Sequence, residues 1–176
     1  YGGSCFPKDV KALIQTSKEN KFNPLILTAV EERNILQKDV LFNKVIQKFG
    51  KDLSNKTFSI WGLSFKPGTD DMREAPSVVT IKSILGIGGK VQVFDPAAKD
   101  TAKIEFSNEE LSKIKFCDSE YDSLIGAEAM ILVTEWGQFR QPDFNQLKSV
   151  LNKPIIFDGR NQYNPDYLSE CGFEYY

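Results

Sequence analysis

A cysteine near the beginning of the chain lies among residues that favour nucleophilic chemistry. Gly2 and Gly3 precede Cys5, and a backbone without side chains allows a ligand to approach closely. Pro7 predicts the start of a helix, so the positive end of the helix dipole and the nearby Lys8 both favour the thiolate of Cys5. The pattern favours a nucleophile, and the alternative is a loop cysteine without a chemical role.

The rest of the composition limits what this thiol can do. Histidine is absent, so neither a Cys–His nor a Ser–His nucleophile pair can be built from this chain alone. Asp9 opposes the thiolate electrostatically, yet it can position a water molecule. The other cysteines, Cys117 and Cys171, lie far apart, which argues against a disulfide framework and fits a reducing cytoplasm. The lack of a CxxC motif or a Cys/His cluster argues against a structural zinc site.

Positively charged side chains follow two of the predicted strands. Lys66 and Arg73 lie in FKPGTDDMRE, directly after an apolar run, and Arg160 follows another such run. Ligands of parallel sheets bind beyond the carboxyl ends of the strands. Two or three of these cations in one crevice would suit a diphosphate, and the alternative is that they belong to solvated loops.

Short apolar runs alternate with helical stretches throughout residues 52–176. This alternation is typical of a parallel sheet with helices on both faces, so an α/β fold is predicted. Strands are expected at 57–63, 90–95, 114–117, 129–134 and 154–159, and helices at 76–87, 121–125 and 143–151.

The first 51 residues are predicted to be helical. A helix at 7–19 precedes a long helix at 24–49, which ends at Gly50. Apolar residues spread around more of the long helix than one neighbouring domain can cover. We therefore expect a homodimer through this helix, with Leu41 and Val45 in the interface unless they serve the core of their own chain.

Other signals argue against further binding functions. The net charge of −2 offers no basic field for nucleic acid. The longest apolar run is far too short to span a bilayer, so no membrane association is expected. The glycines of GIGG at 86–89 end a predicted helix, which indicates a C-cap rather than a dinucleotide loop.

Five segments of the chain resemble, in their order, the nucleotide-sugar dehydrogenases of the UDP-glucose/GDP-mannose dehydrogenase family. They are YGGSCFPKDVKAL, FKPGTDDMREAPS, FDP at 94–96, TEW at 134–136 and FDGRN at 157–161. The resemblance covers nearly the whole chain and is greatest to members that oxidise UDP-glucose to UDP-glucuronate. It implies the cofactor NAD, a dimer formed by a long central helix, and a Rossmann-like domain that binds the nucleotide end of a UDP-sugar.

The resemblance also implies roles for individual residues. Cys5 is similar to the family nucleophile, which forms a thiohemiacetal and then a thioester, and Asp9 to the carboxylate that assists the hydrolytic water. The implied substrate contacts are Tyr1, Gly2, Phe65, Lys66 and Arg160, and the implied NAD contacts are Lys8 and Arg73.

This chain resembles only the second half of such an enzyme. The family's NAD fingerprint, and the lysine and asparagine that polarise the reacting oxygen, lie upstream of the matching part. We therefore expect a catalytic and dimerising segment at 1–51, a Rossmann-like UDP-sugar-binding domain at 52–176, and no turnover by this chain alone. The alternatives are a dehydrogenase of GDP-mannose or a UDP-N-acetyl sugar, a binding and dimerisation module without catalysis, and a cysteine hydrolase or acyltransferase, which the lack of histidine disfavours.

Overall fold

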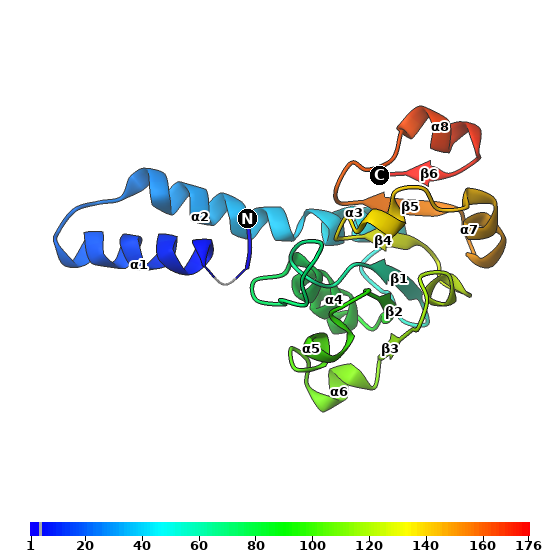
Figure 1. Cartoon of the computed structure of the whole chain (residues 1–176), viewed down its shortest axis with the longest axis horizontal. Coiled ribbons are helices and arrows are strands. Elements are labelled where there is room, and N and C mark those ends of the chain that lie inside the picture. Colours follow the sequence, from blue (N-terminus) through cyan, green and yellow to red (C-terminus); the bar gives the residue numbers. More distant parts are fainter. Residues whose placement is uncertain (4) are drawn as a thin grey trace.

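A helical hairpin projects from an α/β domain (Figure 1). The computed structural model describes residues 1–3 and 5–176. Helices α1 (Phe6–Glu19) and α2 (Leu25–Lys38) run antiparallel, and α3 (Val40–Phe49) continues from α2 into the domain. The amino end of the chain lies at the base of this hairpin, so it is close to the sheet (Figure 1).

The long helix predicted at 24–49 begins at Leu25 and is interrupted once. Asp39 separates α2 from α3. Its N–H bonds to the carbonyl of Leu36, three residues back, at 3.3 Å, which is a tighter turn than the α-helical one. Gly50, with φ of 84°, ends α3 at the predicted position.

Six parallel strands form one sheet in the order β3-β2-β1-β4-β5-β6. Thr57 of the central strand lies opposite Lys90 on one side, and Ser59 lies opposite Met130 on the other. The five predicted strands are all present, whereas the sixth has only two residues and was not predicted. The bounds are β1 (Thr57–Trp61), β2 (Lys90–Phe94), β3 (Ile114–Phe116), β4 (Met130–Leu132), β5 (Ile155–Asp158) and β6 (Glu174–Tyr175).

Helices cover both faces of the sheet, which confirms the predicted α/β architecture. The remaining helices are α4 (Pro76–Gly86), α5 (Lys99–Lys103), α6 (Asn108–Leu111), η1 (Asp122–Leu124), η2 (Gly137–Phe139), α7 (Phe144–Val150) and α8 (Pro165–Glu170). On one face, α3 and α4 bury Val45 and Ile84 in a cluster with Ile60 of β1. On the other face, Phe139 of η2 packs at 4.9 Å from the ring of Trp61.

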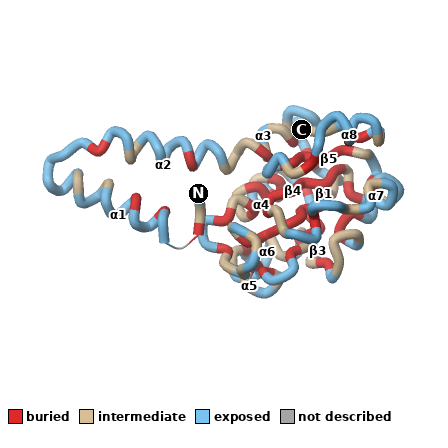
Figure 2. The backbone as a smooth tube through the Cα atoms, turned by 45° about the horizontal axis from the view of Figure 1, so that its top comes forward, coloured by how far each residue is buried: buried red, intermediate tan, exposed pale blue. Residues whose placement is uncertain are grey.

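Leu41 and Val45 serve the core of their own chain, so their predicted place in a dimer interface is wrong. Both are buried in the cluster between α3 and the sheet. Most of the exposed large apolar side chains lie instead on the hairpin, where most residues are exposed (Figure 2). Ile26, for example, is 80% exposed. Within the described residues, no helix is both long and apolar enough to cross a membrane.

The glycines at 86–89 end α4. The N–H of Gly88 bonds to the carbonyl of Leu85 at 3.1 Å, and that of Gly89 bonds to the carbonyl of Ile84 at 3.0 Å. Gly88 has a φ of 89°, which a residue with a side chain rarely adopts. The predicted C-cap is therefore confirmed.

Candidate functional site

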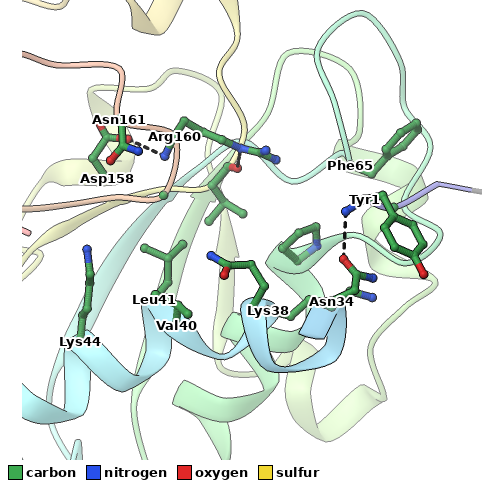
Figure 3. A pocket seen from close by; sticks show the side chains of 15 residues that line it. Tyr1, Asn34, Lys38, Val40, Leu41, Lys44, Phe65, Asp158, Arg160 and Asn161 are labelled. Carbon is green, nitrogen blue, oxygen red and sulfur yellow. Dashed lines mark hydrogen bonds between the residues drawn. The ribbon is translucent and has the colours of Figure 1, made fainter. Parts of the chain in front are cut away.

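A cavity of about 360 Å³ lies beyond the carboxyl ends of β1, β4 and β5 (Figure 3). The strand order reverses between β1 and β4, and ligands of open α/β sheets bind at such a point. The junction of α2 and α3 forms a second wall, and the amino end of the chain a third. The lining residues are Tyr1, Gly2, Asn34, Gln37, Lys38, Val40, Leu41, Lys44, Phe65, Pro76, Val133, Asp158, Gly159, Arg160 and Asn161.

The walls of this cavity carry positive charge. Lys38 and Lys44 come from the α2–α3 wall, and Arg160 comes from the opposite side, after β5 (Figure 3). The Arg160 Nε donates to the carbonyl of Val133 at 2.6 Å and lies 2.9 Å from a carboxylate oxygen of Glu135. The amino end of α4 also borders the cavity. Together these groups suit an anion with more than one negative charge.

The buried carboxylate of Asp158 organises the loop that carries Arg160. One oxygen accepts the N–H of Arg160 at 2.8 Å, and the other accepts the N–H of Gln162 at 2.7 Å and of Tyr163 at 3.1 Å. The hydroxyl of Tyr175 donates to this second oxygen at 2.9 Å. Burial and this bond to a carboxylate raise the pKa of Tyr175 well above its usual value, so the hydroxyl keeps its proton.

Asp95 organises the turn after β1. One of its oxygens accepts the N–H groups of Leu63 at 2.7 Å and of Ser64 at 3.1 Å, and the indole N–H of Trp136 at 3.0 Å. Thr134 adds a hydrogen bond from its hydroxyl to the carbonyl of Ser64 at 2.5 Å. The FDP and TEW segments therefore shape the strand ends. The two N–H groups after β1 already bond to Asp95, so this turn offers no ready site for the phosphates of a dinucleotide.

The loop before Cys5 packs directly on the segment after β1. The N–H of Gly3 bonds to the carbonyl of Arg73 at 3.0 Å. A Cβ added to Gly3 would lie 2.7 Å from the Phe65 ring, and a Cβ added to Gly2 would lie 3.1 Å from the carbonyl oxygen of Glu74. Gly3, which also has a φ of 84°, is therefore needed for this close approach, and a side chain at Gly2 would be tightly confined.

Cys5 lies at the amino end of α1, as predicted. Its carbonyl accepts the N–H of Asp9 at 3.0 Å, and its side chain is exposed. The exposed side chains of Lys8 and Asp9 lie 3.6 Å apart. The pKa of Arg73 is raised, first by its hydrogen bond to Asp71 and also by the nearby Cys5. The backbone of Arg73 contacts the loop before Cys5, and its side chain is 67% exposed.

The cavity brings together only part of the site expected from the sequence. Tyr1, Gly2, Phe65 and Arg160 line it, whereas Cys5, Lys8, Asp9, Lys66 and Arg73, all described residues, do not. Of the three cations that could share one crevice or lie in solvated loops, Arg160 lines this cavity, and Lys66 and Arg73 do not. The ammonium of Lys66 lies 5.3 Å from the centroid of the Phe65 ring, and Arg73 bonds to Asp71 at 2.9 Å.

Sequence reasoning missed the polar residues of the α2–α3 wall. Asn34, Lys38 and Lys44 line the cavity, and Asn34 is buried while its side-chain oxygen accepts a bond from the Tyr1 nitrogen at 2.9 Å. A signal was present, because Asn34 and Lys38 lie four positions apart, and Lys38 and Lys44 each lie three positions from Leu41. The prediction from sequence assigns an interface to the apolar residues of that helix and no role to its polar residues.

Two family models match the chain. The UDP-binding domain of the UDP-glucose/GDP-mannose dehydrogenase family matches residues 59–165, and the central domain of the same family matches residues 1–35. The cavity therefore lies where the two matched parts meet.

Curated proteins and solved structures agree with this match. UDP-glucose 6-dehydrogenase of Pseudomonas aeruginosa is 44% identical over 99% of this chain and 39% of its own length. UDP-glucose 6-dehydrogenase of Rickettsia bellii is 37% identical over 100% of this chain and 40% of its own length. The structure of a UDP-glucose dehydrogenase from Pyrobaculum islandicum superposes with a TM-score of 0.79 at 28% identity, over 91% of this chain and 34% of that one. The chain thus spans about two fifths of the length of these curated relatives.

Proposed function

The chain belongs to the UDP-glucose/GDP-mannose dehydrogenase family, and from this membership we propose that it is part of an NAD-dependent enzyme that oxidises UDP-glucose to UDP-glucuronate. The observation that carries the proposal is the cavity at the strand ends, where Lys38, Lys44 and Arg160 face one space. A diphosphate bound there would be neutralised from two sides, and the amino end of α4 would add its dipole. The nucleotide end of the substrate therefore belongs in this cavity.

The sugar would extend from the diphosphate toward the loop that precedes Cys5. Tyr1 and Gly2 line the cavity, and Gly3 leads from them toward the cysteine. In the proposed reaction the C6 alcohol first loses a proton and a hydride to give the aldehyde. The Cys5 thiolate adds to this aldehyde, and loss of a second hydride from the resulting thiohemiacetal gives a thioester. Asp9 then assists a water molecule that releases the acid and returns the thiol. NAD supplies the hydride acceptor when it is bound.

In this proposal, Lys8 and Arg73 are the residues of this chain that contact NAD. Arg73 fits such a contact because its side chain is 67% exposed and its backbone bonds to Gly3 of the cysteine loop. The turn after β1 does not fit the cofactor phosphates, because Asp95 already accepts its N–H groups. Consistent with that, we propose that the chain alone does not turn over. We also propose that the protein works in a reducing cytoplasm, as the spacing of its cysteines suggests.

The hairpin supports the proposed homodimer. The exposed apolar side chains of α2 include Leu25, Ile26, Leu36 and Val30, and such a surface is normally covered by a partner. A second copy of the chain would cover it through the helical segment at 24–49. The proposed division of the chain places this segment and the cysteine loop at 1–51 and the UDP-sugar-binding domain at 52–176.

The test uses the intact protein that carries this chain, with Cys5→Ala and Asp9→Asn variants and Cys171→Ala as a thiol control outside the loop. We expect Cys5→Ala to abolish steady formation of UDP-glucuronate. Asp9→Asn should slow hydrolysis by about 10²- to 10⁴-fold and let a covalent adduct accumulate. Rapid quench with intact-protein mass spectrometry follows both. Near wild-type rates of acid formation in Cys5→Ala would refute the nucleophile, and oxidation of GDP-mannose but not UDP-glucose would refute the substrate.

A further inference from the structure

One carboxylate joins the helical hairpin to the wall of the cavity. Glu74 accepts a hydrogen bond from Lys11 of α1 at 2.7 Å, and its other oxygen accepts one from Lys38 of α2 at 2.6 Å. The Lys38 side chain is 11% exposed and lines the cavity, whereas that of Lys11 is 48% exposed and does not. Glu74 thus contacts both a helix that begins at the cysteine loop and a cation of the proposed nucleotide site.

The backbone around Glu74 makes a third connection. Glu74 has a φ of 57°, in the left-handed region that residues with side chains adopt at an energetic cost. The carbonyl of the preceding residue, Arg73, accepts the N–H of Gly3, and the Glu74 carbonyl lies close to Gly2. The strained turn therefore meets the loop before Cys5 with its backbone, while its side chain reaches both helices.

The two lysines keep this carboxylate charged. Their hydrogen bonds, first from Lys11 and then from Lys38, lower the pKa of Glu74 to about 2. Ion pairs between exposed groups contribute little to the stability of a fold. Lys38, by contrast, is largely enclosed and needs a partner to stay in the wall beside two other cations.

We propose that Glu74 is a positioning residue that holds Lys38 in the cavity wall and, through Lys11, fixes α1 and the cysteine loop relative to the bound nucleotide. The inference rests on the proposed function, since it takes the cavity as the nucleotide site. Glu74 touches neither substrate nor reacting atoms in this arrangement. It acts through Lys38 on binding and through Lys11 on the position of the thiol.

The direction in which UDP affinity changes on neutralisation of Glu74 distinguishes a positioning role from a purely electrostatic one. Glu74 is an anion next to a site for an anion, so if Coulomb repulsion alone acted, its neutralisation would tighten binding of UDP. If Glu74 positions Lys38, the same change weakens binding, because the lysine no longer holds its place in the wall. Glu74→Gln removes the charge with little change in shape, which makes it the informative substitution.

The experiment measures UDP binding to the intact protein by isothermal titration calorimetry. We expect Glu74→Gln to weaken UDP binding about 3- to 10-fold and Lys38→Met about 10-fold, as for loss of a charged hydrogen bond. In a double-mutant cycle, Glu74→Gln should have no more than about a twofold effect in the Lys38→Met background. A general loss of structure would persist in that background. Lys11→Met, which removes the other partner of the same carboxylate, is the control and should bind UDP within about twofold of wild type.

The second arm is measured by turnover. Lys11→Met should lower kcat for UDP-glucuronate formation about 3- to 10-fold at unchanged UDP affinity, because a displaced catalytic group loses rate steeply. Tighter UDP binding by Glu74→Gln, an undiminished effect in the Lys38→Met background, or an unchanged kcat in Lys11→Met would each overturn the inference. Absence of UDP binding by the wild-type protein would instead refute the proposed function itself.

Discussion

Replacement of Gly3 by alanine tests the packing of the cysteine loop on the cavity wall. Gly3 has a φ of 84°, and a Cβ placed there would lie 2.7 Å from Cζ and 2.8 Å from Cε2 of Phe65. Phe65 lines the cavity, so its ring would have to move away from the loop. The substitution therefore adds backbone strain and displaces a wall of the proposed nucleotide site.

The substitution Gly68→Ala separates the cost of backbone strain from the cost of the clash with Phe65. Gly68 lies in the loop after β1 with a φ of 79°, but nothing lies within 4 Å of the position of its Cβ. Alanine there carries only the left-handed backbone cost, about 1–2 kcal/mol. Gly3→Ala adds the cost of overpacking against Phe65, about 1–3 kcal/mol. The cost lies at the lower end of this range if the Phe65 ring rotates away easily.

The assay compares the three proteins by equilibrium denaturation and by UDP titration. Because the loop can detach without global unfolding, we expect Gly3→Ala to change the affinity for UDP more than it changes the free energy of unfolding. One to two kcal/mol of lost contact corresponds to about 5- to 30-fold weaker UDP binding for Gly3→Ala. Gly68→Ala should bind UDP within about threefold of wild type, because Gly68 does not line the cavity. Equal affinities for the two variants would show that the contact between Gly3 and Phe65 does not shape the site.

The remaining predictions concern the hairpin, the core and Glu74. Val45→Ala should lower the free energy of unfolding by about 2 kcal/mol, because it removes two fully buried methyl groups from the core. Ile26→Glu on the exposed face of α2 should change that energy by less than about 0.5 kcal/mol while sedimentation shows loss of the dimer; a dimer that survives would argue against this face. The pKa of Glu74 is depressed to about 2 from its ordinary 4.5, so its stabilisation is present above pH 4.5 and is lost as pH falls toward 2. The difference in unfolding free energy between wild type and Glu74→Gln should therefore be constant from pH 5 to 8 and shrink in acid, and a difference that changes near neutral pH would contradict the assignment.

Local features of the chain were readable from the sequence. The apolar runs predict β4 and β5, whose residues are all buried, because a strand buried on both faces needs apolar side chains at nearly every position. Pro7 and Gly50 mark helix ends, and the glycines at 86–89 mark another, through the φ angles that these residues impose or permit. The sequence also placed Cys5 at a helix amino end, and the family resemblance added the proposed roles of Cys5 and Asp9.

The composition of the cavity wall was decided by tertiary structure. Lys38 and Arg160 are 122 positions apart in the sequence and share a cavity because β4 and β5 pair on one side of β1, while Leu41 of α3 packs against Gly159 after β5. Lys66 and Arg73 have the charge expected at that site, yet Phe65 and Asp71 hold them elsewhere. The break at Asp39 and the two-residue β6 have equally weak local signals. Residue type and spacing encode interactions within a turn or a strand, whereas the meeting of distant side chains depends on strand order and on the partners that packing brings to each charge.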